Sequence, residues 1–500
     1  MDSERSRWLI LLVLSSALFL VSVDVTVLYI ALPIVARDLD TTASQKIWIV
    51  SAYFLVVTGL LPGLGALGDR FGYKRMFLSG LAVFGIASLG AAHSPTAEAL
   101  IASRAVAAVG AAMMTPATLS IVSLSFGDAR ERSFAIGVWG AIASGGALIG
   151  PVIGGVLVEY AHWGSVFLIN VPIVVVTLLA AWWLIPGCDG DADAVWDFKG
   201  SLQIMVGLVG IAGAIESLAQ ENPLWLKAVG MAVIGLAVTA IFVRGQRRSK
   251  RPMIDLGLLA NADFTWAIIL ALVSSVSVVG LELVLSQRLQ LVLSYSPLEA
   301  ALFVSSGAAF ALLGGLLAGW LAPHLGNRHA MIATLVVGGL GVLGLLLTAR
   351  LGTWPQIVSL SMFGLSEGAT VVVAAYVIMS SVQASKTGMA ASIQEFAFEF
   401  GSAIGVSLMG AVQVGVYSAF LVLPNVALPP SVHESIDMAL EVVETLPYEA
   451  GQLLSNAVHD AFDTAYLVTL AVTLAIQVVL LLGFAFRAPL LRSPAGNSRD

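Results

Sequence analysis

The sequence predicts an all-α polytopic membrane protein with fourteen transmembrane helices, arranged as two six-helix repeats with two helices inserted between them. Three observations lead to this prediction. Apolar residues make up 58% of the 500-residue chain and charged residues only 11%, whereas soluble domains average about 45–50% and about 25%. Long apolar runs recur along the whole chain, and the basic residues fall mainly on one side of them. A motif from the first half returns in the second half.

Apolar runs of helical length place the spans, because a helix needs about 20 residues to cross the hydrocarbon core of a bilayer. The first run follows Arg5 and Arg7, as the core of a signal peptide would, but it is too long for one and contains Asp24. We therefore expect it to remain as a membrane helix. The expected spans cover residues 8–30, 46–66, 76–93, 98–121, 134–158, 165–185, 200–219, 225–243, 264–290, 298–322, 329–350, 355–381, 388–417 and 463–486.

The placement of lysine and arginine tests this count, because basic residues collect on the cytoplasmic side of membrane proteins. With both termini in the cytoplasm, 18 of the 24 Lys and Arg fall in cytoplasmic segments and four in outer loops. Arg104 and Arg288 fall within a span or at its edge. We therefore expect a multi-pass protein of the plasma (inner) membrane with both termini cytoplasmic.

The spans group into four parts along the chain. Residues 1–185 should form an N-terminal six-helix bundle, residues 186–262 a linker with two inserted helices, residues 263–486 a C-terminal six-helix bundle, and residues 487–500 a cytoplasmic tail. The outer loop at 418–462 has no Lys or Arg, and its acidic residues have spacings compatible with short helices. This loop is either a solvated cap or a mouth that attracts cations by electrostatic steering.

An internal repeat supports the division into two bundles. Residues 65–75 close the second span, and residues 319–329 repeat their Gly, Leu, Gly and basic positions at an offset of 254. The glycines of 146–150 return in 401–405 at nearly the same offset. Transporters built from two repeats place the substrate at the repeat interface, near the bilayer midplane.

Five motifs in this order resemble those of the major facilitator superfamily, specifically its fourteen-span drug:proton antiporter branch. They lie at residues 23–33, 48–53, 65–75, 146–155 and 163–172. The resemblance covers nearly the whole chain and implies the major-facilitator fold. It also implies export of quaternary ammonium compounds and lipophilic cationic dyes.

The cytoplasmic loop motif has a physical interpretation. A charge pair at a helix end can reach the adjacent helix and the helix termini, so it could act as a latch for the inward-closed state. The alternative is a topology anchor only. The residues of this conformational motif are Gly65, Asp69, Arg70, Gly72, Lys74 and Arg75.

The fifth span carries a glycine stripe. Gly146, Gly150 and Gly154 recur every four residues and leave one helix face without side chains. Pro151 frees a backbone carbonyl and permits a bend. The stripe is either ordinary close packing or, as the resemblance implies, a hinge that seals against leak and so enforces exchange.

Acidic residues inside spans are functional candidates, because a charge in the bilayer is costly. The candidates for substrate or proton binding are Asp24, Glu282, Glu367, Glu395 and Glu399. Glu395 and Glu399 lie one helical turn apart and should resist ionising together in a low-dielectric cavity. Such a pair can hold a proton and release it when a cation arrives. Each acid could instead be structural, bonded to a neighbouring helix or paired with Arg104.

Arg104 and four aromatic residues complete the candidate site. A charge within the fourth span calls for a buried partner or a part in proton coupling. The family motif usually continues with Gln and Gly where Ala107 and Ala108 stand. Aromatic rings can stack on flat cations or face lipid. The candidates are Tyr53, Trp139, Tyr376 and Phe396.

These observations predict a proton-coupled multidrug efflux transporter that exports lipophilic cations by alternating access. The alternative is a dedicated exporter of an endogenous product, such as an antibiotic or siderophore, on the same scaffold. The chain has no Walker A sequence, one cysteine (Cys188) and six scattered histidines. We therefore expect no enzyme activity, cofactor, metal site or nucleic-acid partner. The expected partners are lipophilic cationic small molecules, protons and membrane lipid, and we expect a monomer driven by the proton gradient.

Overall fold

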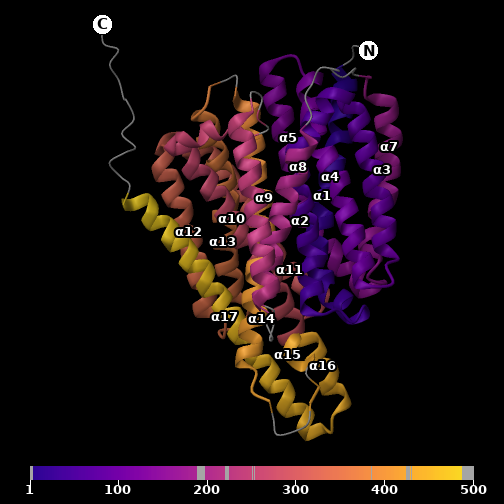
Figure 1. Ribbon diagram of the computed structural model, residues 1–500, viewed down its shortest axis with the longest axis vertical. Helices are drawn as coiled ribbons and strands as arrows, with labels where there is room; N and C mark the ends of the chain where they lie inside the picture. Colours follow the sequence, from indigo (N-terminus) through magenta and orange to yellow (C-terminus); the bar gives the residue numbers. More distant parts are fainter. Residues whose placement is uncertain are drawn as a thin grey trace. The chain divides into compact units, whose positions relative to one another are not determined.

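The computed structural model describes residues 4–187, 197–219, 225–249, 252, 254–383, 386–423, 428–429 and 431–486. Within these ranges every regular element is a helix (Figure 1), and 14 helices are long and apolar enough to cross a membrane. The predicted fold class and span number are confirmed. Cys188 and the predicted tail at 487–500 lie outside the described residues.

The first half of the chain forms nine helices in the described part. They are α1 (Glu4–Asp38), α2 (Ala43–Phe71), α3 (Tyr73–Ala92), α4 (Ala97–Ser125), α5 (Ala129–Tyr160), α6 (Ser165–Leu168), α7 (Asn170–Leu184), α8 (Phe198–Ala219) and α9 (Trp225–Arg248). The described helices that follow are the 3₁₀ helix η1 (Leu256–Ala260), α10 (Ala262–Gln287), the π-helix η2 (Arg288–Val292), α11 (Pro297–Leu325), α12 (Asn327–Thr348), α13 (Thr353–Ser380), α14 (Thr387–Phe420), α15 (Ser431–Glu434), α16 (Ile436–Thr445) and α17 (Tyr448–Phe486).

Local sequence explains where several helices begin. Thr42 caps α2 in a capping box with Gln45, and the Thr96 side chain accepts from the Ala99 N–H at the start of α4. Between α2 and α3 the chain turns at Gly72 with φ 91°, and between α11 and α12 it turns at Gly326 with φ 74°. Positive φ favours glycine. Because these glycines are 254 residues apart, the predicted repeat is present in the backbone as well as in the sequence.

The chain divides into two compact units. The first contains residues 1–253, 279–305 and 402–469, and the second contains residues 254–278, 306–401 and 470–500. In the first unit α1 packs along α5, α4 packs on both α2 and α3, and the inserted helices α8 and α9 pack on each other, with α8 against α2. In the second unit α12 packs along α13.

Glycines at matching positions of the repeat make matching helix contacts. A Cβ added at Gly146 of α5 would meet Phe19 and Ser22 of α1. A Cβ added at Gly401 of α14 would meet Leu272 and Ser275 of α10. The α5–α1 approach is therefore reproduced by α14 and α10, as duplication of six helices requires.

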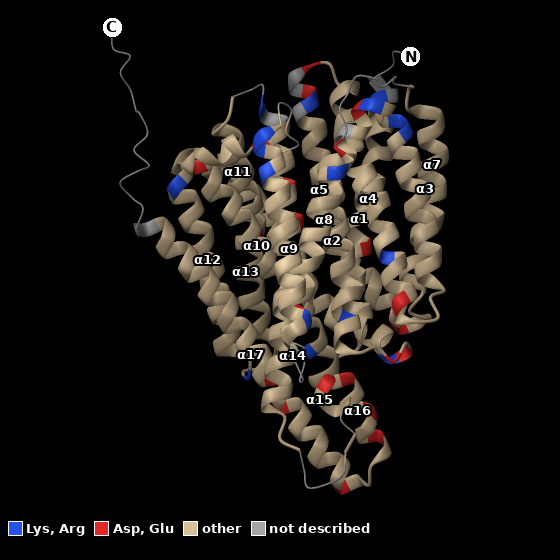
Figure 2. Cartoon of the chain, viewed as in Figure 1, with Lys and Arg blue, Asp and Glu red and all other residues tan. Residues whose placement is uncertain are grey.

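Charged residues lie mainly outside the apolar middle sections of the helices. Figure 2, a cartoon coloured by residue type, shows the Lys, Arg, Asp and Glu positions of α1–α9 mainly near helix ends, with few along the middle. The last membrane helix departs from the prediction because α17 begins at Tyr448 rather than at residue 463. Its first turns are amphipathic rather than uniformly apolar. They bury Leu454, Val458 and Phe462, which recur at helical spacing.

Candidate functional site

A buried ion pair joins two helices of the first unit. Asp24 of α1 accepts a hydrogen bond from Arg104 of α4, and each residue is only 2% exposed. The other carboxylate oxygen of Asp24 accepts a hydrogen bond of 2.8 Å from the amide nitrogen of Asn170, the first residue of α7. Three helices from one repeat therefore meet at this carboxylate, and the charge expected inside the fourth span has its partner.

Aromatic rings surround the Arg104 guanidinium. Its Cζ atom lies 4.6 Å from the centre of the Tyr53 ring and 5.9 Å from that of Phe167. Tyr53 comes from α2 and is 2% exposed. A cation over an aromatic face is attracted by the ring quadrupole. Tyr53, which the sequence suggested for stacking on a substrate, here stacks on a cation that the chain itself supplies.

Three of the candidate carboxylates belong to the second unit. Glu367 of α13 accepts a hydrogen bond from Ser274 of α10. Glu395 and Glu399 lie one turn apart on α14, and the ring of Phe396 between them is 5.8 Å from the ring of Phe400. In the described part of the chain, one carboxylate oxygen of Glu399 is buried without a hydrogen-bond partner. Among the residues that the structure describes, no Lys or Arg pairs with Glu395 or Glu399.

The other candidates occupy separate places. Glu282 lies on α10 within the first unit, and no described basic side chain forms an ion pair with it. Trp139 of α5 donates a hydrogen bond of 3.1 Å to the Thr118 hydroxyl of α4. Tyr376 of α13 is 37% exposed. Trp139 therefore joins two helices of the first bundle, and Tyr376 lies at the surface of the chain.

Lys74 of the loop motif caps the C-terminal end of α7. Lys74 donates hydrogen bonds of 2.9 Å to the Trp182 carbonyl and 2.5 Å to the Ile185 carbonyl, at the last turn of α7. A lysine is favoured there because a helix C-terminus carries partial negative charge and unpaired carbonyls. Asp69 accepts from the Tyr73 hydroxyl. Asp69, Arg70 and Arg75 are exposed, and Gly65 lies part-buried in α2.

The glycine stripe of α5 faces α1. A Cβ added at Gly150 would meet the Thr26 side chain, and one added at Gly154 would meet the Val27 backbone. The neighbouring Pro151 is buried inside the helix. Because α1 also carries Asp24, the stripe sets how closely α5 approaches the helix that bears the buried carboxylate.

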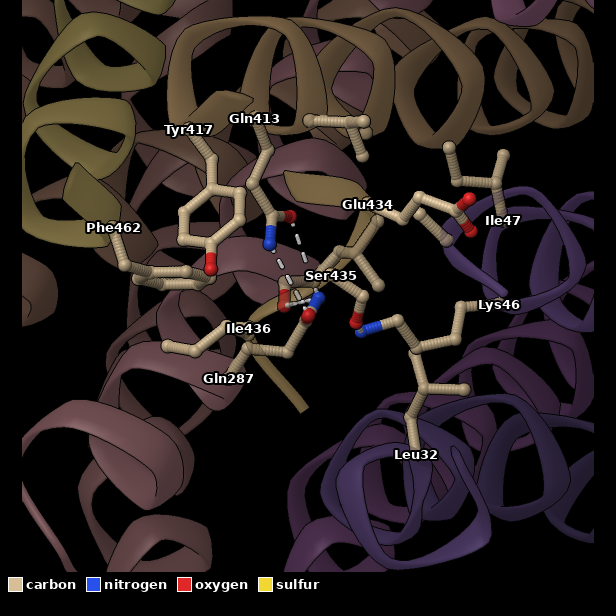
Figure 3. A pocket seen from close by; sticks show the side chains of 14 residues that line it. Leu32, Lys46, Ile47, Gln287, Gln413, Tyr417, Glu434, Ser435, Ile436 and Phe462 are labelled. Carbon is tan, nitrogen blue, oxygen red and sulfur yellow. Dashed lines mark hydrogen bonds between the residues drawn. The ribbon is translucent and has the colours of Figure 1, made fainter. Parts of the chain in front are cut away.

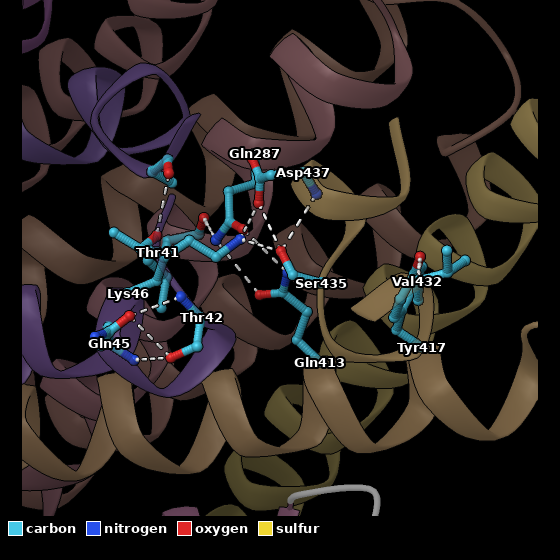
Figure 4. A network of polar contacts seen from close by, with 12 residues as sticks. Thr41, Thr42, Gln45, Lys46, Gln287, Gln413, Tyr417, Val432, Ser435 and Asp437 are labelled. Carbon is cyan, nitrogen blue, oxygen red and sulfur yellow. Dashed lines mark hydrogen bonds and ion pairs between the residues drawn. The ribbon is translucent and has the colours of Figure 1, made fainter. Parts of the chain in front are cut away.

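A second polar cluster was not predicted from the sequence. Lys46 of α2 pairs with Asp437 of α16 and donates a hydrogen bond of 3.1 Å to Ser435 (Figure 4). The Lys46 and Asp437 side chains are only 8% and 6% exposed. The two partners are 391 residues apart in the chain. No spacing or periodicity indicates such a contact in advance.

A small cavity adjoins this cluster (Figure 3). The side-chain amides of Gln287 and Gln413 exchange hydrogen bonds across it at 3.4 and 3.2 Å. Figure 3 shows Tyr417 and Phe462 on one side of the amide pair and Lys46 on the other. Nearby in α16, burial raises the pKa of Glu441, and Asp40 adds to the effect. The predicted acidic loop is therefore packed against membrane helices of the first unit through α16.

Further ion pairs lie outside the predicted site. Arg288 of η2 donates a hydrogen bond of 2.7 Å to Asp463 of α17, and its guanidinium Cζ lies 4.6 Å from the centre of the Tyr466 ring. The sequence singled out Arg288 only as a charge at a span edge. In the second unit, a hydrogen bond from Lys386 lowers the pKa of Asp255.

Similarity to known proteins identifies the family of the chain. The sequence profile of the Major Facilitator Superfamily matches residues 14–406. The chain belongs to the Major Facilitator Superfamily. It is 34% identical over 486 residues to the multidrug efflux pump LfrA of Mycolicibacterium smegmatis, with 96% of each chain covered. It is 32% identical over 488 residues to the methyl viologen resistance protein SmvA of Salmonella typhimurium, with 96% of this chain and 98% of the relative covered.

A solved structure agrees with the fold. A bacterial homolog of the human lysosomal transporter Spinster, in an inward-facing unoccupied conformation, matches with a TM-score of 0.68. The match covers 97% of this chain and 99% of the other at 16% sequence identity. The chain is therefore a multi-pass membrane protein of a transporter superfamily, with fourteen candidate spans and with drug-efflux proteins among its relatives.

Proposed function

We propose that the protein is a proton-coupled multidrug exporter that moves lipophilic cations outward by alternating access. The observation that carries the proposal is the carboxylate pair Glu395 and Glu399, which lies inside a membrane helix without a described basic partner. A carboxylate buried in a membrane protein needs a proton or a cation to neutralise it. The relatives support this choice, because SmvA is a resistance protein for methyl viologen, and methyl viologen is a bipyridinium dication.

The two groups of carboxylates have different tasks in this proposal. Glu395 and Glu399 hold a proton until a cation arrives, because two adjacent carboxylates in a low-dielectric site resist ionising together. Phe396, on the same helix, offers a ring face to a flat cation. Asp24 is neutralised by Arg104 in this structure. It becomes available only in a state in which Arg104 has another partner.

The exchange couples two gradients. A cation enters from the cytoplasm or the inner leaflet, displaces the proton and leaves outward, after which protons from outside reset the carrier. If two protons exchange for one monovalent cation, the membrane potential contributes about 2.3 kcal/mol per 100 mV for the net charge moved. The proposal places the protein in the plasma (inner) membrane with both termini cytoplasmic. It requires no cofactor, and a monomer suffices.

Vesicles with a controlled proton gradient test the proposal. Purified protein in liposomes should transport a lipophilic cationic dye when an inward proton gradient is imposed and should stop when the gradient is collapsed. Glu395→Gln and Glu399→Gln should each reduce proton-driven transport at least tenfold. Glu449→Gln, an exposed acid in the first turn of α17, is the matched control and should leave transport unchanged. Equal transport with and without the gradient would refute the coupling.

Substrate range distinguishes a dedicated exporter from a multidrug exporter. A multidrug exporter should move several structurally unrelated lipophilic cations, each competing with the others for the same carboxylates. A dedicated exporter should move one compound and ignore the panel. Competition between an acridinium dye and a quaternary ammonium compound in the same vesicles measures this directly.

A further inference from the structure

Asn170 leaves an unfilled hydrogen-bond acceptor inside the membrane part of the first unit. The residue is fully buried, and its amide nitrogen lies 2.8 Å from an Asp24 oxygen and 3.3 Å from the Ser88 hydroxyl of α3. Its amide oxygen is buried with no hydrogen-bond partner in the described part of the chain. An orphaned buried acceptor is destabilising and calls for an explanation.

The two protonation states of Asp24 explain the unpaired oxygen of Asn170. An ionised carboxylate only accepts hydrogen bonds, so Asn170 has to turn its NH₂ group toward Asp24 and its oxygen away. A protonated carboxyl must instead donate. Arg104 offers donors only, so it cannot receive that proton. Of the two polar neighbours that hold Asp24 here, only Asn170 carries an acceptor.

A half-turn of the Asn170 amide satisfies the protonated state. This torsion has a broad, two-fold profile, so exchanging the oxygen and nitrogen positions keeps the side-chain shape. After the half-turn the amide oxygen accepts from the Asp24 hydroxyl. Ser88 adjusts as well, because a hydroxyl that accepts from NH₂ can rotate to donate to a carbonyl oxygen. Once Arg104 has another partner, the same three side chains therefore serve both protonation states of Asp24.

The other groups around Asp24 do not offer this exchange. Arg104 comes from α4, and Tyr53 of α2 contributes its ring to the Arg104 guanidinium. From α6, Phe167 contributes a ring near the same guanidinium. Helix α5 faces α1 with its glycine stripe, which carries no titratable group. The Asn170 side-chain amide is thus the group of the cluster that can exchange its donor and acceptor positions.

We propose that Asn170 is a positioning residue that adapts to the protonation state of Asp24, donating to the carboxylate and accepting from the carboxylic acid. This inference rests on the proposed function, in which Asp24 takes part in proton-coupled transport. It assigns Asn170 a task that a packing residue would not have. Removing the amide should shift the pH dependence of proton release that involves Asp24. A residue that only packs would change the stability of the protein alone.

The test compares Asn170→Leu with Thr177→Val in purified protein. Thr177 is a buried residue of the same helix, and its hydroxyl lies 3.0 Å from the Ser16 hydroxyl of α1. Both variants remove one α7–α1 hydrogen bond, but only Asn170→Leu removes it from Asp24. The readouts are proton release on adding a lipophilic cation, measured across pH, and the infrared C=O stretch of protonated Asp24.

The expected result is specific to Asn170. Charge-assisted hydrogen bonds are the stronger ones, so Asn170→Leu removes more from the ionised state of Asp24 than from the protonated state. It should raise by about one unit the pH midpoint of the part of proton release that is absent in Asp24→Asn. Its protonated Asp24 band, assigned by its absence in Asp24→Asn, should move to higher wavenumber, because the hydroxyl has lost its acceptor. Thr177→Val should keep the wild-type midpoint and band. Asn170→Thr restores a group that donates and accepts, so its midpoint should lie closer to wild type than that of Asn170→Leu.

Failure of the inference can be told from failure of the proposed function. If wild-type protein releases no proton on cation binding, the proposed function fails. If wild type releases protons and Asn170→Leu keeps the same midpoint and infrared band as Thr177→Val, only the role of Asn170 is overturned. Should Asn170→Leu fail to fold, the smaller Asn170→Ala carries the same expectations.

Discussion

Arg104 on α4 donates a hydrogen bond to Asp24 on α1, and their side chains are only 2% and 1% exposed. Each charge is the principal reason that the other can stay inside the helix bundle. Such a pair contributes little net stability when intact, but removing one partner leaves an uncompensated buried charge. Stability and transport should therefore respond differently to single and double substitutions.

Asp24→Asn should destabilise the protein by about 3–5 kcal/mol, because Arg104 then lies buried without a counter-ion. Transport should be lost as well. The double variant Asp24→Asn/Arg104→Gln should recover much of the stability and none of the proton-driven transport. Thermal unfolding in detergent and dye transport in liposomes measure the two effects. Recovery of transport in the double variant would contradict a direct role for this pair.

Cation binding should strengthen as pH rises. Proton loss and cation binding are linked, so the apparent affinity for a monovalent lipophilic cation should rise up to about tenfold per pH unit for each proton released. Glu399→Gln removes one titrating group and should flatten this dependence. Fluorescence titration of a dye across pH checks the slope. The Glu449→Gln control should keep the wild-type slope, and an equally steep slope in Glu399→Gln would exclude Glu399 as a proton carrier.

Gly150→Val should impair transport by separating two helices. A Cβ at Gly150 would meet the Thr26 side chain and come within 3.3 Å of the Val23 backbone. Gly145→Val is the matched control on the same helix, because a Cβ there meets nothing within 4 Å. We expect Gly150→Val to lower transport at least tenfold and Gly145→Val to have little effect. Equal transport by the two variants in liposomes would show that close approach of α5 to α1 is unnecessary.

Lys46→Met should destabilise the protein by about 3–5 kcal/mol, because it leaves Asp437 buried without its partner. Arg37→Gln is the comparison, since the Arg37–Glu444 pair is 63% and 65% exposed. Exposed pairs contribute only about 0–1 kcal/mol. Thermal unfolding of both variants gives the difference, and Lys46→Met/Asp437→Leu should regain part of the loss. Equal effects of Lys46→Met and Arg37→Gln would mean that burial of the pair does not matter.

Most of the fold could be predicted because it is recorded locally in the sequence. Apolar runs mark the spans, and glycines such as Gly72 and Gly326 mark turns that favour positive φ. The start of α17 was misplaced because its first turns are amphipathic and hydropathy alone does not extend the span through them. Local signals describe single helices well and their continuations less well.

Contacts within the candidate site could be predicted less well. Asp24 and Arg104 each stand out as charges inside apolar runs, but they are 80 residues apart, and no periodicity says that they meet. Asn170 belongs to the motif at residues 163–172, but that motif does not indicate its contact with Asp24. Lys46 and Asp437 looked like outer-loop charges until the packing of α16 buried them. Pairing between distant helices is a property of packing, which composition does not record.

The guanidinium on the Tyr53 ring has a consequence for selectivity. In the proposed mechanism, a cation that approaches Asp24 competes with the Arg104 guanidinium, which is attached to the same molecule. A competitor on a short tether acts at an effective concentration of about millimolar or more. In that mechanism, we expect weakly binding cations to be excluded by competition with Arg104 rather than by the shape of the binding site. A cation that displaces Arg104 from Asp24 would release a side chain of α4, so its binding on α1 would also affect a neighbouring helix.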